Sequence, residues 1–197
     1  MDRTKQLEQI TGKYLSERYE KSKQYIREYY FLNSKRVYEE LEKVVHHGLQ
    51  RCKNGEKKVK HIAISILFSS ILTKSYELQV AFLDERIYMD EAPVEEYWAP
   101  VFIFERVEED MQYFRKMAAL EMPRIKEYEM EPIRNAYVSL HYFLVMLLLR
   151  EVIPGIVENI FSQYGILEKD VMVSFGRHME KGVLLYQRGK KNEIFSY

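Results

Sequence analysis

The sequence predicts an α+β fold, mostly helical and in a single domain over residues 1–197. Three patterns favour this class: apolar residues at helical spacing in the first quarter, a two-residue alternation between positions 62 and 82, and an uncharged run from Asn135 to Leu149. We expect residues 1–55 to form a helical hairpin and residues 56–197 to form a mixed core.

The first quarter has the spacing of two helices. A stripe at alternating steps of four and three residues predicts one helix from about Lys5 to Leu32; it consists of Leu15, Tyr19, Ser22, Ile26 and Tyr29. Asn33-Ser34 offers a turn and an N-cap. The second helix ends before Asn54-Gly55, and one of its faces carries Val37, Leu41, Val44, Val45 and Gly48.

A small antiparallel sheet is predicted from about Val59 to Met89. Two segments alternate with a period of two, the first through Ile62, Ile64, Ile66 and Phe68, the second through Tyr76, Leu78, Val80 and Phe82. After Asp84-Glu85, a short run from Arg86 to Met89 fits a third strand. Helical spacing also runs through Ile66, Ser70, Thr73 and Glu77, so an all-α fold remains the alternative.

The C-terminal half is predicted to be helical around a buried core. An amphipathic helix with an acidic outer face, including Glu105, Glu108, Glu109 and Asp110, precedes Pro123. The run from Asn135 to Leu149 reads as a central buried helix between Pro132 and Pro154, with Pro154 opening another helix. Its fifteen residues span about 22 Å, less than the roughly 30 Å of a bilayer core, so we expect no membrane span. Further on, Val171, Val173 and Phe175 alternate like an edge strand.

The composition is that of an ordered globular protein, with 47% hydrophobic and 30% charged residues. Cys52 is the single cysteine and the first ten residues lack a signal-peptide core, so we expect a cytoplasmic protein without disulfides. The net charge is zero, yet Met1 to Lys60 holds 15 Lys/Arg against 9 Asp/Glu, and Glu77 to Glu131 holds 6 against 15. This separation is compatible with head-to-tail self-association or with a basic end for an anionic partner, although solvated helix faces are the simpler explanation.

Metal ligands are sparse. Glu42 and His46 share a helix face and His47 lies beside them, which makes these three residues weak candidates. Neither histidine shares a face with Cys52, and the chain lacks the repeated C-x-x-C or H-E-x-x-H spacing of zinc sites. We therefore expect no metal and no cofactor.

His141 is the one imidazole in the uncharged run. A buried imidazole costs free energy unless its nitrogens have partners, so we expect a hydrogen bond to a tyrosine or to a backbone carbonyl. The alternative is a ligand pocket or active site with His141 at its floor and Tyr137 one turn away.

No catalytic signature is present. Ser174 in M-V-S-F-G resembles a nucleophile elbow, but Met172 stands where that strained turn needs glycine. Gly12-Lys13 and Gly189-Lys190 lack the spacing of a phosphate loop. Whether the protein is an enzyme is left open by the sequence.

Three classes of function are compatible with these observations. The favoured hypothesis is a non-catalytic intracellular interaction or regulatory protein that forms a homo-oligomer or docks on a protein partner, with Tyr19, Tyr29 and Trp98 as candidate surface residues. The second is a small-molecule-binding protein or enzyme with a pocket at His141. The third, nucleic-acid binding through the basic, tyrosine-rich N-terminal helices, is disfavoured by interspersed glutamates and a pI near 7.0.

Overall fold

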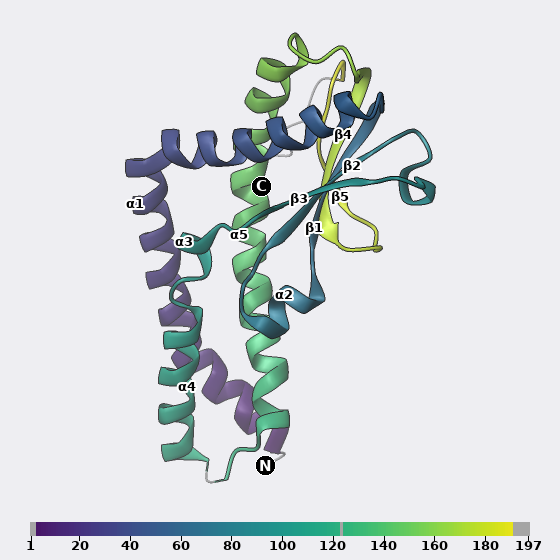
Figure 1. Ribbon diagram of the computed structural model, residues 1–197. Coiled ribbons are helices and arrows are strands. Elements are labelled where there is room, and N and C mark those ends of the chain that lie inside the picture. Colours follow the sequence, from purple (N-terminus) through teal and green to yellow (C-terminus); the bar gives the residue numbers. More distant parts are fainter. Residues whose placement is uncertain (1–2, 123, 191–197) are drawn as a thin grey trace. The chain divides into compact units, whose positions relative to one another are not determined.

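The computed structural model describes residues 3–122 and 124–190 and confirms the α+β class with mostly helix (Figure 1). In chain order, the elements are α1 (Arg3–Asn54), β1 (Val59–Ile66), α2 (Phe68–Thr73), β2 (Leu78–Leu83), the 3-10 helix η1 (Ile87–Met89), β3 (Val94–Trp98), α3 (Val101–Phe104), α4 (Val107–Glu121), α5 (Glu127–Phe161), β4 (Leu167–Arg177) and β5 (Val183–Gln187).

The chain forms two compact units, each built from two separate stretches. Unit 1 consists of Met1–Ser34 and Val101–Val145, and unit 2 of Lys35–Pro100 and Met146–Tyr197. Unit 1 is therefore helical, and unit 2 contains the whole sheet. The single domain over residues 1–197 stays a prediction.

The first helix is continuous except at one residue. Asn33 has non-helical angles (φ −123°, ψ 16°), and its side-chain amide donates a hydrogen bond of 2.8 Å to the carbonyl of Tyr29. Such a local bond competes with the helical pattern, which explains why the break falls at an asparagine. The break lies where the sequence predicts a turn, but Ser34 is already helical. The hairpin over residues 1–55 stays a prediction.

The sheet has the strand order β3-β2-β1-β4-β5. β1 and β2 pair antiparallel as predicted, with Ile62 opposite Phe82 and Ile64 opposite Val80. The expectation that the strand around Val171 lies at an edge was wrong. β4 lies between β1 and β5 and runs parallel to β1. Parallel neighbours need a long connection, and the chain between β1 and β4, which includes α5, is long enough to provide it.

The third strand is β3, so the prediction of a strand from Arg86 to Met89 was wrong. These residues belong to the connection between β2 and β3, where η1 forms and Ile87 adopts a left-handed conformation (φ 55°). The side chain of Ile87 packs against the cluster of Ala63, Ala81 and Leu83. Packing of this kind offsets the strain of a β-branched residue at positive φ.

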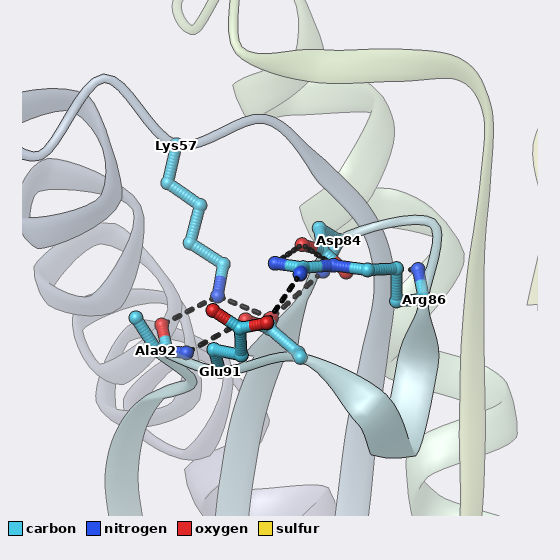
Figure 2. Close-up of polar contacts among 6 residues, drawn as sticks. Lys57, Asp84, Arg86, Glu91 and Ala92 are labelled. Carbon is cyan, nitrogen blue, oxygen red and sulfur yellow. Dashed lines mark hydrogen bonds and ion pairs between the residues drawn. The ribbon is translucent and has the colours of Figure 1, made fainter.

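A polar network closes the same connection (Figure 2). Asp90 accepts the backbone N–H groups of Asp84 and Ala92, each at 3.0 Å, and forms an ion pair with Lys57. Lys57 also donates to the carbonyl of Ala92 at 2.6 Å. Burial works to raise the pKa of Asp90, but these hydrogen bonds outweigh it and hold the pKa below its usual value. The connection between β2 and β3 is therefore fixed by Asp90 and tied through Lys57 to the segment between α1 and β1.

The helix α5 extends well beyond the uncharged run at both ends. It continues through Pro132 and Pro154, so the predicted start and stop were wrong. A proline inside a helix costs about 3 kcal/mol. Around Pro154 this is offset by buried neighbours, each stabilising by about 1.5–3 kcal/mol: Val152, Ile153, Ile156 and Val157.

Burial along the uncharged run is one-sided. Tyr137, His141 and Val145 are buried, whereas Leu140 and Phe143 are 45% and 52% exposed. Among the residues that the structure describes, α5 is the one helix long and apolar enough to cross a membrane, and half of its most apolar window is buried inside the protein. The argument that the helix is too short to cross a membrane assumed fifteen residues, whereas α5 has 35. The absence of a membrane-spanning helix therefore stays a prediction.

Gly48 allows the second half of α1 to pack on the sheet. A Cβ at this position would overlap the ring of Phe82, which is fully buried on β2. We predict that Gly48→Ala destabilises the protein by about 1–3 kcal/mol, because overpacking outweighs a gain of about 1 kcal/mol in helix propensity. Urea denaturation measures the change.

Gly155→Ala on α5 is the matched control, since its Cβ would only reach ordinary contact with Tyr38 at 3.5 Å. We expect that variant to be neutral or slightly stabilising. A Gly48→Ala protein as stable as the wild type, or one that Phe82→Leu fails to rescue, would contradict the packing described.

Candidate functional site

Unit 1 contains a buried carboxylate, that of Asp110 on α4, which is 0% exposed. The hydroxyl of Tyr137 on α5 donates to its Oδ2 at 2.7 Å, and the hydroxyl of Ser22 on α1 donates to the same atom at 2.9 Å. A guanidinium nitrogen of Arg18 lies 3.5 Å from Oδ1. Three helices thus converge on one negative charge.

The expectation that Asp110 belongs to a solvated acidic face was wrong. The sequence carried a signal, because Asp110 lies three residues after Val107 and four before Phe114, and both are fully buried. Ser22 gave the complementary signal as a polar residue within an apolar stripe. The sequence alone did not connect Asp110 with Ser22, because Asp110 was grouped with the acidic residues Glu108 and Glu109 before it.

The surroundings stabilise this charge. Arg18 is 21% exposed and stacks over the ring of Tyr113 at 3.9 Å, which fixes the guanidinium beside the carboxylate. Burial and the hydrogen bond to Asp110 raise the pKa of Tyr137 far above its ordinary value. Tyr137 therefore remains a hydrogen-bond donor throughout the physiological range.

His141 lies one turn after Tyr137 and is 0% exposed. Its Nδ1 is 2.9 Å from the carbonyl oxygen of Tyr137; a carbonyl only accepts, so Nδ1 carries the proton. The rings of Tyr137 and Tyr19 surround it at centroid distances of 4.9 and 5.7 Å. Burial lowers the pKa of His141, which keeps the imidazole neutral near pH 7.

A groove of about 370 Å³ opens between α1 and α5 of unit 1. The lining residues are Thr11, Gly12, Leu15, Ser16, Tyr19, Glu20, Ile133, Ala136, Tyr137 and Leu140. Leu15 and Tyr137 are its buried residues, while Gly12, Ser16 and Ala136 are small and exposed. The groove therefore combines a floor that is anchored through Tyr137 to Asp110 with walls of small side chains.

Of the two predicted pocket residues, only Tyr137 is among the residues that line the groove. Tyr137 lines the groove, whereas His141 is not among its lining residues and packs against Phe104 at a ring distance of 6.1 Å. The structural interpretation of His141, a core histidine bonded to a carbonyl, agrees with this geometry. A ligand pocket at His141 stays a prediction.

The predicted surface tyrosines and the tryptophan are all partly or fully buried. Tyr19 is half-buried in the groove wall, with its ring 6.3 Å from that of Tyr137. Tyr29 stacks on Phe102 at 4.7 Å. Trp98, at the end of β3 in unit 2, is 5% exposed and belongs to the core there.

The weak metal candidates in unit 2 are not brought together. His46 is 2.9 Å from the hydroxyl of Tyr164, and His47 is 2.9 Å from a carboxylate oxygen of Glu96. Glu42 accepts a hydrogen bond from Asn159 at 2.7 Å. Within residues 3–122 and 124–190, no group of three or more His, Cys, Asp or Glu side chains is placed to hold a metal ion.

Ser174 has a histidine partner that the sequence did not reveal. Nε2 of His61 on β1 lies 2.8 Å from Oγ of Ser174 on the neighbouring strand β4. A Ser–His–Asp arrangement needs an acid on Nδ1, but Nδ1 of His61 is buried without a hydrogen-bond partner in the described chain. Both strands lie inside the sheet, with a neighbouring strand on either side. The pair is a cross-strand hydrogen bond rather than a catalytic dyad.

Comparisons with protein-family models, with curated proteins and with solved structures found no match to this chain.

The hydrogen bond from Tyr137 to Asp110 generates a stability prediction. Tyr137→Phe removes one donor from a buried charge, and we expect a loss of about 1.5–3 kcal/mol in the free energy of unfolding. Tyr128→Phe, at an exposed position on the same helix, is the control and should stay within about 0.5 kcal/mol.

The same variant has a pH signature. An unfolded tyrosine loses its proton near pH 10, whereas Tyr137 in the folded state keeps it, so this contribution is present below pH 10 and is lost as the pH rises. The difference between wild type and Tyr137→Phe should therefore shrink above about pH 10. A constant difference from pH 8 to 11 would argue against the buried bond.

His141 generates a second pH prediction with the opposite direction. Its pKa is lowered in the folded state, so the unfolded chain binds a proton first and stability falls as the pH drops below about 6.5. We expect His141→Gln to reduce this slope by about 1.4 kcal/mol per pH unit, measured by urea denaturation between pH 7.5 and 5.5. His178→Gln, at an exposed position, is the control variant. If the His141 ring of the wild type titrates near pH 6.5 by NMR, the expectation fails.

Proposed function

We propose that this protein is a non-catalytic interaction protein that forms a homodimer through the α1–α5 face of unit 1. The observation that carries the proposal is the open side of α5, where Leu140 and Phe143 are 45% and 52% exposed beside an apolar groove. Large exposed apolar side chains next to a preformed hollow are typical of protein interfaces.

The shape of this face supports a second copy as the partner. Ala136 and Phe143 are seven residues apart, so they lie on the same side of α5, about 10 Å apart along its axis. Phe143 protrudes, while Ala136 and Gly12 leave space in the groove. In an antiparallel pairing with the two-fold axis near Ser139, Phe143 of each copy reaches the small residues of the other.

Such an interface satisfies the requirement of two-fold symmetry. Each copy offers both the large residue and the hollow, and therefore the same contact forms twice. The α5 part of this face carries no charge from Asn135 to Val145, so no ion of this segment has to lose its water. Towards α1 the rim is polar, with a shallow depression lined by Glu17, Glu20, Lys21, Lys23, Gln24 and Arg27.

The charges of this rim also disfavour nucleic acid. Lys21 pairs with Glu17 at 2.6 Å and Lys23 with Glu20 at 3.1 Å. A phosphate backbone would have to compete with these carboxylates for the same cations. The basic, tyrosine-rich helix is therefore better suited to form the polar rim of a protein interface than to bind nucleic acid.

Sedimentation equilibrium between about 1 and 100 μM tests the proposal, since small interfaces hold in this range. We expect the wild type to be a dimer. Leu140→Glu and Phe143→Glu should each weaken it at least about tenfold, because each places an unpaired charge in the interface.

Leu120→Glu is the matched control, since Leu120 is 78% exposed on α4 and lies outside the groove. It should leave the dimer intact, and circular dichroism confirms that all three variants are folded. A monomeric wild type at 100 μM, or a dimer indifferent to Leu140→Glu, overturns the proposal.

A further inference from the structure

The imidazole of His141 has one nitrogen with a partner and one without. Nδ1 donates to the carbonyl of Tyr137 at 2.9 Å, and Nε2 is buried without a hydrogen-bond partner in the described part of the chain. A second proton therefore has to bind Nε2, where the structure offers the new N–H no acceptor. A buried cation of this kind is costly unless water or an anion can reach it.

Aromatic rings enclose this imidazole. Those of Tyr137 on α5, Tyr19 on α1 and Phe104 on α3 lie at centroid distances of 4.9, 5.7 and 6.1 Å. Tyr19 and Tyr137 also line the groove between α1 and α5, whereas Phe104 does not. The imidazole is thus one layer of side chains away from a groove that is open to water.

The charged group that acts on His141 is Asp110 on α4, which favours the protonated imidazole. Its carboxylate is already held by the hydroxyls of Ser22 and Tyr137 and by the guanidinium of Arg18. Burial outweighs the effect of Asp110 and lowers the pKa of His141. The balance between the neutral and the charged ring therefore depends on how much water lies near it.

Dimer formation changes this amount of water. In the dimer proposed above, Phe143 of the second copy fills the groove that Tyr19 and Tyr137 line, and water leaves it. Removal of water from around a titratable group disfavours its charged form. A proton on His141 is therefore bound more weakly in the dimer than in the monomer, and by reciprocity the two copies bind each other more weakly when the proton is present.

We propose that protonation of His141 dissociates the dimer, which makes the α1–α5 interface a pH-sensitive contact. The inference rests on the proposed dimer and adds its regulation. Two-fold symmetry places one His141 beside each groove, so two protons are taken up for each dimer that separates. Dimer affinity is complete above the pH at which His141 of the monomer titrates and is lost as the pH falls through it, by up to about a hundredfold in Kd per pH unit.

Sedimentation equilibrium of the full chain at pH 7.5 and 5.5 tests the proposal. We expect the Kd of the wild type to be at least about tenfold higher at pH 5.5, with circular dichroism showing a folded protein at both values. His141→Gln keeps a donor for the carbonyl of Tyr137 but takes up no proton, so its dimer should be equally tight, within about twofold, at both. His178→Gln, at an exposed position in unit 2, is the control and should respond to pH like the wild type.

NMR titration of the His141 ring gives a second readout that needs no substitution at this residue. Phe143→Gln should be monomeric and leaves the groove open to water without adding a charge beside the ring. A tenfold change in Kd over two protons corresponds to a pKa difference of about 0.5, so we expect the pKa of His141 to be higher by at least this amount in Phe143→Gln than in the wild-type dimer. Leu120→Gln, at an exposed position outside the groove, should titrate like the wild type.

Three results overturn the inference and leave the dimer itself intact. They are a wild-type dimer equally tight at pH 7.5 and 5.5, a His141→Gln dimer that weakens with acid as the wild type does, and a His141 ring with the same pKa in the wild type and in Phe143→Gln. A wild type that is monomeric at pH 7.5 overturns the proposed function and the inference with it. The two kinds of failure are therefore distinguishable.

Discussion

The arrangement of unit 1 depends on the buried carboxylate of Asp110. A charge without water is tolerated only when hydrogen bonds and an opposite charge surround it, and here these come from Ser22 and Arg18 on α1 and Tyr137 on α5. Because the partners sit on different helices, a shift of any of the three helices by one turn would take at least one partner away from the carboxylate. Asp110 therefore fixes the register of α1, α4 and α5, and with it the position of Tyr137 in the groove.

The uncharged run from Asn135 to Leu149 has a buried side and an exposed side, and its composition alone does not distinguish them. Its buried side carries Tyr137 and His141, the groups that connect to Asp110 and to the aromatic cluster. Its open side carries Leu140 and Phe143. A run without charge predicts burial on all sides, but the chain leaves one side for something else, and the proposed dimer accounts for that side.

Periodicity predicted the parts of the fold that local geometry decides. The alternation at Ile62 to Ile66 and at Leu78 to Phe82 identified β1 and β2, because successive side chains of a strand point to opposite faces. The direction of β4 was not predictable, since the same alternation serves parallel and antiparallel pairs. Pro154 was misleading because tertiary packing overrides local propensity. The burial of Asp110 could have been predicted from its helical spacing to Val107 and Phe114. Its partners on the other helices could not, because local spacing says nothing about contacts between helices.

The proposed dimer surface follows from the distribution of charge rather than from its total. In a chain with 30% charged residues, an exposed surface without charge is a departure that requires a cause. β3 illustrates the usual solution, an edge closed by glutamates and by Arg51. The other edge strand, β5, has no charge within its bounds, but it has only five residues and its register shifts at Leu185, and a short, bulged strand is itself a poor template for strand addition.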